Sequence, residues 1–396
     1  MSRQLPSAKK IDLNRASSKS FARNIWTYGL AIFLLASGCD FKLPKPPPDL
    51  FHKFNTLQTG QGPADLLSVD LDLDGEIDIV SANAKNSTVT IHYGYGDGTF
   101  RQTVTIRVLA EPTSLAVGDL NHDQLPDIIV NARGANSFSA LLGKKGRSFS
   151  RARTHKTGRV PLAVIVSDYN GDGHLDVAVT LTFDKMEIYL GGGNGYFKKG
   201  ETYLTGSRSF SGVAQDFNRD GKMDLALAVT STQSSAIRVF LGNGDGTFGK
   251  PKIFAVGEMP LGVISHDMNG DGLTDLISAT GKGDNMVLLY SNGDGSFREK
   301  IDFSGGGGPI DLVAGHFNND DLIDVAVANS RSSSWSLVIR NKSGFFHYPT
   351  RDYIVDGGAP LAITTADFNH DDLADIAVAS NAKNTIEIYL QKRLFR

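Results

Sequence analysis

Acidic and amide side chains recur in this chain in a nine-residue pattern that appears seven times and fills positions 1, 3, 5 and 9 of each copy. The copies contain Asp70, Asp72, Asp74 and Asp78; Asp119, Asn121, Asp123 and Asp127; Asp168, Asn170, Asp172 and Asp176; Asp216, Asn218, Asp220 and Asp224; Asp267, Asn269, Asp271 and Asp275; Asn318, Asp320 and Asp324, with His316 at position 1; and Asp367, Asn369, Asp371 and Asp375. Calcium takes about six to eight oxygen ligands, which a short loop supplies by turning alternate side chains inward. The pattern therefore predicts calcium sites, with a bidentate carboxylate at position 9 and a backbone carbonyl at position 7.

The seven copies are unequal as ligand sets. Glycine occupies position 6 in four of them, where a sharp turn favours a positive φ, whereas the second copy has Gln124 there. In the sixth copy His316 replaces the first carboxylate, so we expect that site to be weak or empty. The alternative reading is a set of polar turns between strands, because Asp, Asn and Gly are common turn residues. An EF-hand is excluded, since position 12 is Ser81 in the first copy and Val179 in the third rather than Glu.

The spacing of the copies indicates the elements that position them. Successive first positions lie 49, 49, 48, 51, 49 and 51 residues apart, which is typical of a repeat architecture. Short apolar runs rich in β-branched residues stand before and after each copy, and a third run leads into a glycine-rich turn, as in Gly96–Phe100. Four antiparallel strands per repeat predict an all-β, seven-bladed β-propeller with the acidic loops between the first and second strands.

The phase of the repeats predicts how the ring closes. Residues 51–58 have the pattern of a fourth strand, and the chain ends after a third strand at residues 385–390. We therefore expect residues 51–58 to complete the last blade. The aromatic residues that end the repeated turns are expected to pack between blades; they are Phe100, Phe149, Phe197, Phe248, Phe297 and Phe346.

These loops and the turns of the Gly-Asp-Gly-Thr-Phe type resemble the FG-GAP (VCBS) repeats of integrin α-chain propellers, fungal seven-bladed lectins and many bacterial surface proteins. The resemblance covers residues 51–396. It implies the propeller fold and calcium, but it leaves the function open, because such propellers serve adhesion, sugar binding and enzyme accessory roles. In the integrin propellers, the ligand docks on the face away from the calcium loops.

The first 38 residues do not fit the repeat. Basic residues precede a short apolar run from Ile25 to Ala36, which indicates a secretory signal rather than a membrane span. The residues around Cys39 resemble a bacterial lipobox, so the resemblance implies lipid attachment at Cys39; the alternative is an ordinary cleavage site followed by an idle cysteine. Proline-rich residues 39–50 would form a stiff tether. These features predict an extracytoplasmic, lipid-anchored protein of the cell envelope, with the choice of membrane left open.

Charge and motifs narrow the function. Residues 1–38 carry six of the 40 basic and one of the 43 acidic residues, so the remaining chain has a net charge near −8. An acidic propeller is a poor candidate for binding nucleic acid. The chain contains no G-x-S-x-G or H-E-x-x-H motif and no second cysteine. We therefore expect a non-catalytic binding or assembly module, monomeric, with structural calcium and a partner among envelope or extracellular proteins or polysaccharides.

Basic residues in the connections opposite the acidic loops form a candidate ligand face: Lys85, Arg133, Arg159, Arg208, Lys282, Arg331 and Lys383. The alternative is that these connections are simply good hairpin turns. Two other functions stay open. A lectin would use aromatic residues on that face, for which Phe183, Phe210 and Trp335 are candidates. A polysaccharide hydrolase or lyase would need paired carboxylates outside the acidic loops, for which Glu111, Asp184, Glu258 and Asp284 are candidates.

Overall fold

The computed structural model describes residues 47–393 except 102, 233–234, 319 and 347–349. The expected signal sequence, the expected lipidation site at Cys39 and the first part of the expected tether lie outside these residues. The described chain belongs to one compact unit, Pro46–Arg396. Within the described residues, no helix has the length and apolar character needed to cross a membrane.

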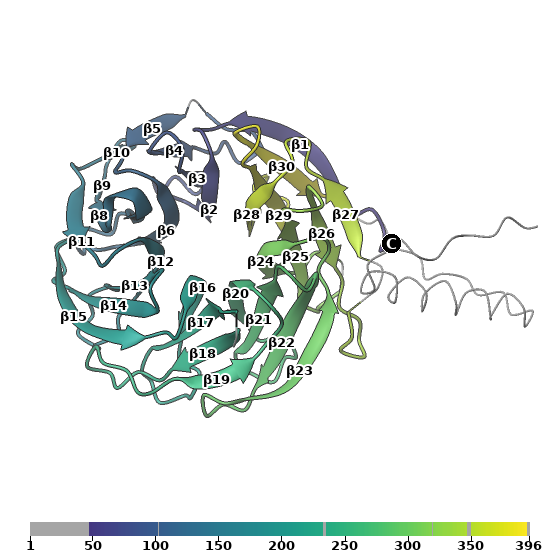
Figure 1. The fold of residues 1–396 in the computed structure, drawn as a ribbon. Helices are drawn as coiled ribbons and strands as arrows, with labels where there is room; N and C mark the ends of the chain where they lie inside the picture. The colour runs from purple at the N-terminus through teal and green to yellow at the C-terminus, as the bar shows by residue number, and fades with distance from the viewer. Residues whose placement is uncertain (1–46, 102, 233–234, 319, 347–349, 394–396) are drawn as a thin grey trace, which may run out of the picture. The chain divides into compact units, whose positions relative to one another are not determined.

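The described chain forms seven four-stranded antiparallel sheets arranged as blades around a centre (Figure 1). Blade 1 contains β2 (Pro63–Val69), β3 (Asp78–Asn83), β4 (Thr88–His92) and β5 (Val104–Arg107). Blade 2 contains β6 (Pro112–Gly118), β7 (Asp127–Ala132), β8 (Ser137–Leu141) and β11 (Arg153–Lys156), with a 3₁₀ turn η1 (Arg133–Ala135) and a small hairpin of β9 (Gly143–Lys144) and β10 (Ser148–Phe149). Blade 3 contains β12 (Pro161–Ser167), β13 (Asp176–Leu181), β14 (Lys185–Gly191) and β15 (Phe197–Leu204).

The remaining blades repeat this order. Blade 4 contains β16 (Arg208–Gln215), β17 (Asp224–Thr230), β18 (Ala236–Phe240) and β19 (Lys252–Ala255). Blade 5 contains β20 (Pro260–His266), β21 (Asp275–Thr280), β22 (Asn285–Ser291) and β23 (Phe297–Ser304). Blade 6 contains β24 (Pro309–Gly315), β25 (Asp324–Asn329), β26 (Ser334–Val338) and β27 (Arg351–Ile354). Blade 7 contains β28 (Pro360–Ala366), β29 (Asp375–Ser380), β30 (Thr385–Gln391) and β1 (Phe51–Gln58).

Burial explains the sequence pattern of each blade. The second strand is buried at every position, as in β3, β13 and β29, because it lies between two strands and under the neighbouring blades. Its runs of Val, Ile and Ala are therefore continuous rather than alternating. The fourth strands β5, β11, β19 and β27 alternate between half-buried and exposed positions, as expected for an outer edge with one face packed on the core.

The ring closes as the sequence predicted, because β1 pairs antiparallel with β30 from Phe51 opposite Gln391 to Gln58 opposite Thr385. Phe51 is 1% exposed, and its ring packs edge-on against Trp335 of blade 6 at 5.2 Å between centroids. Leu50 is also buried, and its carbonyl accepts the backbone N–H of Lys392 at 2.7 Å. Leu50, which was expected to belong to the tether of residues 39–50, is therefore packed as part of the propeller.

The two faces of the disc carry different connections. We call the nine-residue copies acidic loops 1–7 (70–78, 119–127, 168–176, 216–224, 267–275, 316–324 and 367–375); each joins a first strand to a second strand. The acidic loops and the glycine-rich turns lie on the same face, which we call the loop face. Hydrogen bonds connect them, since a backbone N–H of a turn donates to a backbone carbonyl in the acidic loop of the preceding blade, as from Gly195 N–H to Leu120 O at 3.0 Å. The opposite face, here the cavity face, carries the second-to-third-strand turns and the connections between blades. These also bond to one another, as from Thr182 N–H to Val160 O at 3.0 Å.

The repeated aromatic residues pack between blades, as predicted. The ring of Phe197 in blade 3 contacts Phe138 of blade 2 at 5.5 Å between centroids. Phe346 of blade 6 stacks on Phe303 of blade 5 at 3.9 Å between ring centroids.

Trp335 is completely buried between blades 6 and 7, so its assignment to a sugar-binding pocket was wrong.

Candidate metal loops and binding face

Acidic loop 1 has the strongest metal-binding geometry in the described chain. One carboxylate oxygen from each of Asp70, Asp72 and Asp78 lies within 4.8 Å of the others. The Oδ1 atoms of Asp70 and Asp72 are buried and have no hydrogen-bond partner. A buried carboxylate oxygen without a partner is costly, and hard oxygen donors are what calcium takes. The residues of loop 1 therefore fit a calcium ion, which Asp70, Asp72 and Asp78 would hold.

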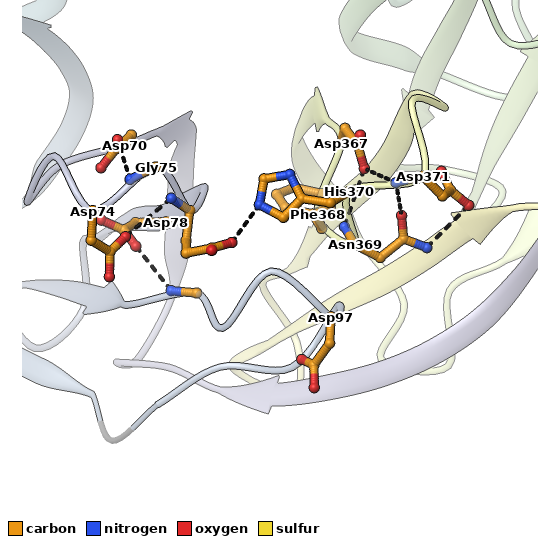
Figure 2. Close-up of polar contacts among 12 residues, drawn as sticks. Asp70, Asp74, Gly75, Asp78, Asp97, Asp367, Phe368, Asn369, His370 and Asp371 are labelled. Carbon is orange, nitrogen blue, oxygen red and sulfur yellow. Dashed lines mark hydrogen bonds and ion pairs between the residues drawn. The ribbon is translucent and has the colours of Figure 1, made fainter.

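The same loop is shaped by hydrogen bonds that leave the Oδ1 atoms of Asp70 and Asp72 without a partner; Figure 2 shows the bond between Asp70 and Gly75. Asp70 Oδ2 accepts the N–H of Gly75 at 2.9 Å, which closes the turn. Gly75 has φ +90°, a conformation that costs glycine little. Arg147 from blade 2 forms ion pairs with Asp72 and, at 3.0 Å, with Asp74. These pairs offset part of the loop's negative charge.

The carboxylate at position 9 has a structural role that the sequence pattern did not reveal. In loop 1, Asp78 Oδ2 accepts the N–H of Leu71 at 2.9 Å, and its Oδ1 accepts the N–H of Gly94 at 2.9 Å. Asp127, Asp176, Asp224, Asp275 and Asp375 repeat both bonds in their own blades. Each of these side chains fastens an acidic loop to the end of a third strand. Its bidentate coordination of calcium stays a prediction.

Burial makes these position-9 carboxylates reluctant to ionise. Burial, with a smaller contribution from the charges of Asp72 and Asp74, raises the pKa of Asp78 to about 7, although the two backbone N–H groups act to lower it. Burial likewise raises the pKa of Asp176 to about 6 and that of Asp375 to about 7. A cation among the loop carboxylates would offset both the burial and the repulsion.

Loops 2–7 have asparagine at position 3, where loop 1 has Asp72, and in loops 2, 3, 5 and 7 this side chain contacts the next ligand. There the amide donates to the carboxylate at position 5, as from Asn170 Nδ2 to Asp172 Oδ2 at 2.9 Å, and as in the pairs Asn121–Asp123, Asn269–Asp271 and Asn369–Asp371. A cation would have to displace this N–H from the carboxylate. In loop 2, Gln124 adopts the positive φ that glycine has elsewhere, at +67°.

Loop 6 is held by a protein contact where the other loops have a carboxylate. His316 Nδ1 lies 3.2 Å from the carbonyl oxygen of Leu322, which is the position-7 carbonyl expected to bind the metal. The imidazole can donate to that oxygen, so this contact occupies a ligand of the expected site. Asp321 at position 6 is not among the described residues with positive φ. These features support the expectation of a weak or empty sixth site.

Arg340 provides a further difference in blade 6. The glycine-rich turns of blades 1, 3, 4 and 5 donate a backbone N–H to the position-2 carbonyl of the preceding loop. In blade 6, the buried guanidinium of Arg340 donates instead to Met268 O of loop 5. A side chain thus makes the link between blades that a backbone group makes elsewhere.

Neighbouring acidic loops are joined by the side chains at position 4 of three of the loops. His122 Nε2 lies 2.5 Å from His174 Nδ1, which links loops 2 and 3. His370 Nε2 lies 2.6 Å from Glu76 Oε2, which links loops 7 and 1 (Figure 2). The guanidinium of Arg219 donates to Gly272 O between loops 4 and 5. A position-4 side chain thus contacts position 6 or 7 of the next loop. A separation of about one repeat could have indicated the contacts of His122 and Arg219, which span 52 and 53 residues, whereas His370 and Glu76 are 294 residues apart and meet only where the ring closes.

A cavity of about 500 Å³ lies at the centre of the ring. Its lining comes from the first strands of all seven blades, near the ends that start on the cavity face, and includes Arg133 and Phe210. Asp65 and Asp311 also line it. Burial raises the pKa of Asp65 to about 7, helped by the charge of Asp311, and burial raises the pKa of Asp311 to about 6.

These two carboxylates connect neighbouring blades. Asp65 Oδ2 accepts the N–H of Leu115 in blade 2 at 2.7 Å, and Asp311 Oδ2 accepts the N–H of Ile363 in blade 7 at 3.0 Å. Ser114 and Ser211 make the same kind of bond at 3.3 and 3.2 Å. The carboxylates at the centre therefore hold the inner strands together, and neither was singled out from sequence.

The seven residues of the candidate ligand face all lie in cavity-face connections or at their borders, but they are not equally free. Lys282 forms an ion pair with Glu258 at 2.6 Å, and Arg331 forms one with Asp284 across blades 5 and 6. Lys85 Nζ donates to Asn381 at 3.2 Å. Reversing the charge of Arg331 would break an inter-blade ion pair as well as change the surface, so Arg331 is a poor probe of binding alone.

The residues considered for a hydrolase or lyase and for a lectin differ in how accessible the structure leaves them. Glu258 and Asp284, two of the four carboxylates considered for catalysis, are used in the ion pairs just described. Phe183 and Phe210, considered for sugar stacking, are 55% and 39% exposed on the cavity face. Aromatic side chains are thus available there, although Trp335 is not.

The fold resembles solved structures with very different sequences. Two structures described as BBS1N in complex with ARL6DN, one soaked with lead and the other with mercury, match with a TM-score of 0.61. The first is 12% identical and covers 88% of this chain and 99% of that chain; the second is 11% identical and covers 87% and 98%. Likeness at this identity shows the fold alone. No curated protein sequence matches this chain.

The model of the FG-GAP-like repeat matches five stretches: residues 70–130, 168–227, 216–277, 267–327 and 316–378. Each stretch begins at position 1 of an acidic loop and runs into the second strand of the following blade. The matched unit is therefore the repeat that places the loops, the buried strands and the inter-blade contacts. With more than half of its length matched, the chain belongs to the family of proteins with FG-GAP-like repeats.

Proposed function

We propose that this protein is a non-catalytic, calcium-stabilised binding or assembly module that acts outside the cytoplasm and is anchored by lipid at Cys39. The observation that carries the binding role is the central cavity on the cavity face, which is lined by all seven blades and bordered by exposed cationic and aromatic side chains. The BBS1N propeller, which has a similar fold, is described in a complex with a protein, and this supports a protein partner.

Calcium has a structural role in this proposal. The free carboxylate oxygens of Asp70 and Asp72 support an ion in loop 1. At a free calcium concentration ten times the dissociation constant, each occupied site stabilises the folded chain by about 1.4 kcal/mol. Several sites together would rival the net stability of a domain, which is about 5–15 kcal/mol.

The test is affinity capture from native envelope extract with the full-length protein, in calcium and in chelator. We expect one protein to be retained near equimolar yield in calcium and to be lost in chelator. A parallel sample treated to degrade polysaccharide should retain the same protein. Release of the protein by that treatment would contradict direct protein binding.

A lectin is the second candidate, and the exposure of Phe183 and Phe210 is the observation that favours it. Binding of a purified polysaccharide that falls when Phe183→Ala and Phe210→Ala are combined, with no protein captured, would replace the assembly proposal by this one. If the protein cleaved the bound polysaccharide in a calcium-dependent reaction, and so produced new chain ends, the non-catalytic assignment would be contradicted.

A further inference from the structure

The two halves of the cavity face differ in how their basic side chains are paired. Over blades 5 and 6, Lys282 and Arg331 are neutralised by neighbouring carboxylates. Over blades 2–4, the exposed side chains of Arg133, Arg159 and Arg208 take part in no ion pair within the described chain. An arginine without a carboxylate partner retains its full capacity to bind one from another molecule.

Apolar side chains are exposed beside these arginines. Phe183 is 55%, Phe210 39% and Leu109 36% exposed. The guanidinium of Arg159 lies over the ring of Phe183, 5.7 Å from its centroid. Phe210 and Arg133 approach the cavity from different blades, since both line it. The surface therefore combines cationic forks with aromatic faces, which is the composition of protein-binding hot spots.

The local charge balance favours an anionic partner. Lys156 and Lys185 are also exposed at strand ends on this side, whereas the acidic residues of its connections are Glu111 and Asp184, and those lining the adjoining cavity are Asp65 and Asp311. Residues 39–396 as a whole are acidic, with a net charge near −8. An acidic partner would be repelled by most of the surface and attracted here, so that complementarity would orient its approach.

We propose that the surface formed by Leu109, Arg133, Arg159, Phe183, Arg208 and Phe210, here called the arginine arc, binds an acidic peptide segment of the protein partner. Carboxylates of the segment pair with the three arginines, and one apolar side chain of the segment contacts Phe210 at the mouth of the cavity. The inference rests on the proposed assembly function and identifies the chemistry and location of its partner. A neutral sugar would leave three arginines without anions, whereas guanidinium groups match carboxylates in a two-pronged geometry.

The test introduces a photoreactive phenylalanine derivative into the full-length protein in its native cells, at one position at a time. Phe183 and Phe210 probe the arc, and Tyr95 and Phe345, which are 54% and 65% exposed on the loop face, are the matched positions. Mass spectrometry then identifies the protein attached and the peptide that carries the link. We expect one protein to be attached through Phe183 and Phe210, within a peptide rich in Asp and Glu.

Charge variants test the arc in the same cells. R133E combined with R159E is expected to lower the yield of the adduct at least fivefold, without changing the thermal midpoint of the purified protein. K250E combined with K342E, at exposed lysines outside the cavity face, is the matched control and should leave the yield within twofold of the parent. K85E combined with K383E, on the other side of the cavity face, should also leave it unchanged.

The outcomes separate this inference from the function on which it rests. If adducts formed only through Tyr95 and Phe345, the assembly function would stand but the arginine arc would not be the binding surface. The arc would also be overturned if K85E/K383E lost as much adduct as R133E/R159E. An attached peptide without acidic residues would also overturn it. No protein adduct at any position would contradict the assembly function itself. If R133E/R159E then lost retention on a sulfated polysaccharide, the arc would be a glycan site instead.

Discussion

At the scale of single residues, the side chains that matter most are carboxylates with two tasks. Position 9 of each acidic loop, as at Asp78, was expected only as a metal ligand, yet in every loop except loop 6 both of its oxygens accept backbone N–H groups. Asp65 was not expected at all, and it joins blades 1 and 2 through the N–H of Leu115. In both cases a carboxylate, buried at Asp78 and half-buried at Asp65, replaces backbone pairing where strands from different parts of the chain meet.

The pH dependence of stability tests the state of Asp65. Its pKa is raised to about 7 in the folded protein by burial, whereas an exposed aspartate titrates near 4. The folded state therefore holds the proton more tightly, and stability falls as the pH rises from about 4 through about 7. Moving from pH 6 to pH 8 should cost about 1 kcal/mol through this residue.

The measurement is the thermal midpoint of the parent protein and of Asp65→Asn at pH 6 and pH 8 in calcium. Other groups titrate in both proteins, so the informative quantity is the difference between their two shifts. The parent should lose more stability than the variant on moving to pH 8. Equal shifts in the two proteins would show that Asp65 ionises normally.

At the scale of the element, the nine-residue loops were the most predictable part of the chain. Their residue types and spacing indicated loops between first and second strands, and the structure has them there. The contacts between loops were not predictable in the same way, because His122 meets His174 only once blades 2 and 3 are side by side. A nine-residue pattern defines each loop, but only the geometry of neighbouring blades defines what position 4 will contact.

Loop 6 gives a direct test of how the first ligand defines a site. Replacing His316 by aspartate, as His316→Asp, restores the carboxylate found at position 1 of the other six loops. We expect the variant to bind one more calcium ion than the parent in a titration monitored by native mass spectrometry. In chelator, it should be less stable than the parent, because it lacks the contact between His316 and Leu322 O.

Asn318→Asp provides the control for added charge in the same loop, since it leaves His316 in place. An equal gain in bound calcium from both substitutions would show that charge alone limits the sixth site. No gain from His316→Asp would show that the altered turn at Asp321, rather than the missing ligand, prevents binding.

At the scale of the whole molecule, the ring is closed by β1 and β30, which lie at opposite ends of the described chain. This closure was predictable from phase alone, because residues 51–58 have the pattern of a fourth strand and residues 385–390 that of a third. The packing that stabilises this closure was not predictable from the sequence, because Phe51 contacts Trp335 and Tyr353 of blade 6 as well as residues of blade 7. Sequence reasoning could count the blades but could not show which residues fill the space between them.

Phe51→Ala should therefore destabilise the whole ring. Removing a fully buried phenylalanine side chain costs about 3–5 kcal/mol, and the closing strand transmits the loss to both neighbouring blades. Phe54→Ala is the matched control in the same strand, because Phe54 is 45% exposed. We expect Phe51→Ala to lower the thermal midpoint in a single transition and Phe54→Ala to change it little. Equal effects would mean that the closing strand contributes little through its buried face.

The central claim is that acidic loops bearing calcium hold this propeller in the form that binds its partner. The most direct test is thermal unfolding of the full-length protein in calcium, in magnesium and in chelator, with circular dichroism as the signal that monitors unfolding. At about 1.4 kcal/mol for each occupied site, five or six sites should raise the thermal midpoint by about 10 °C in calcium, and magnesium should not replace it. A midpoint that is the same in calcium and in chelator would contradict the account.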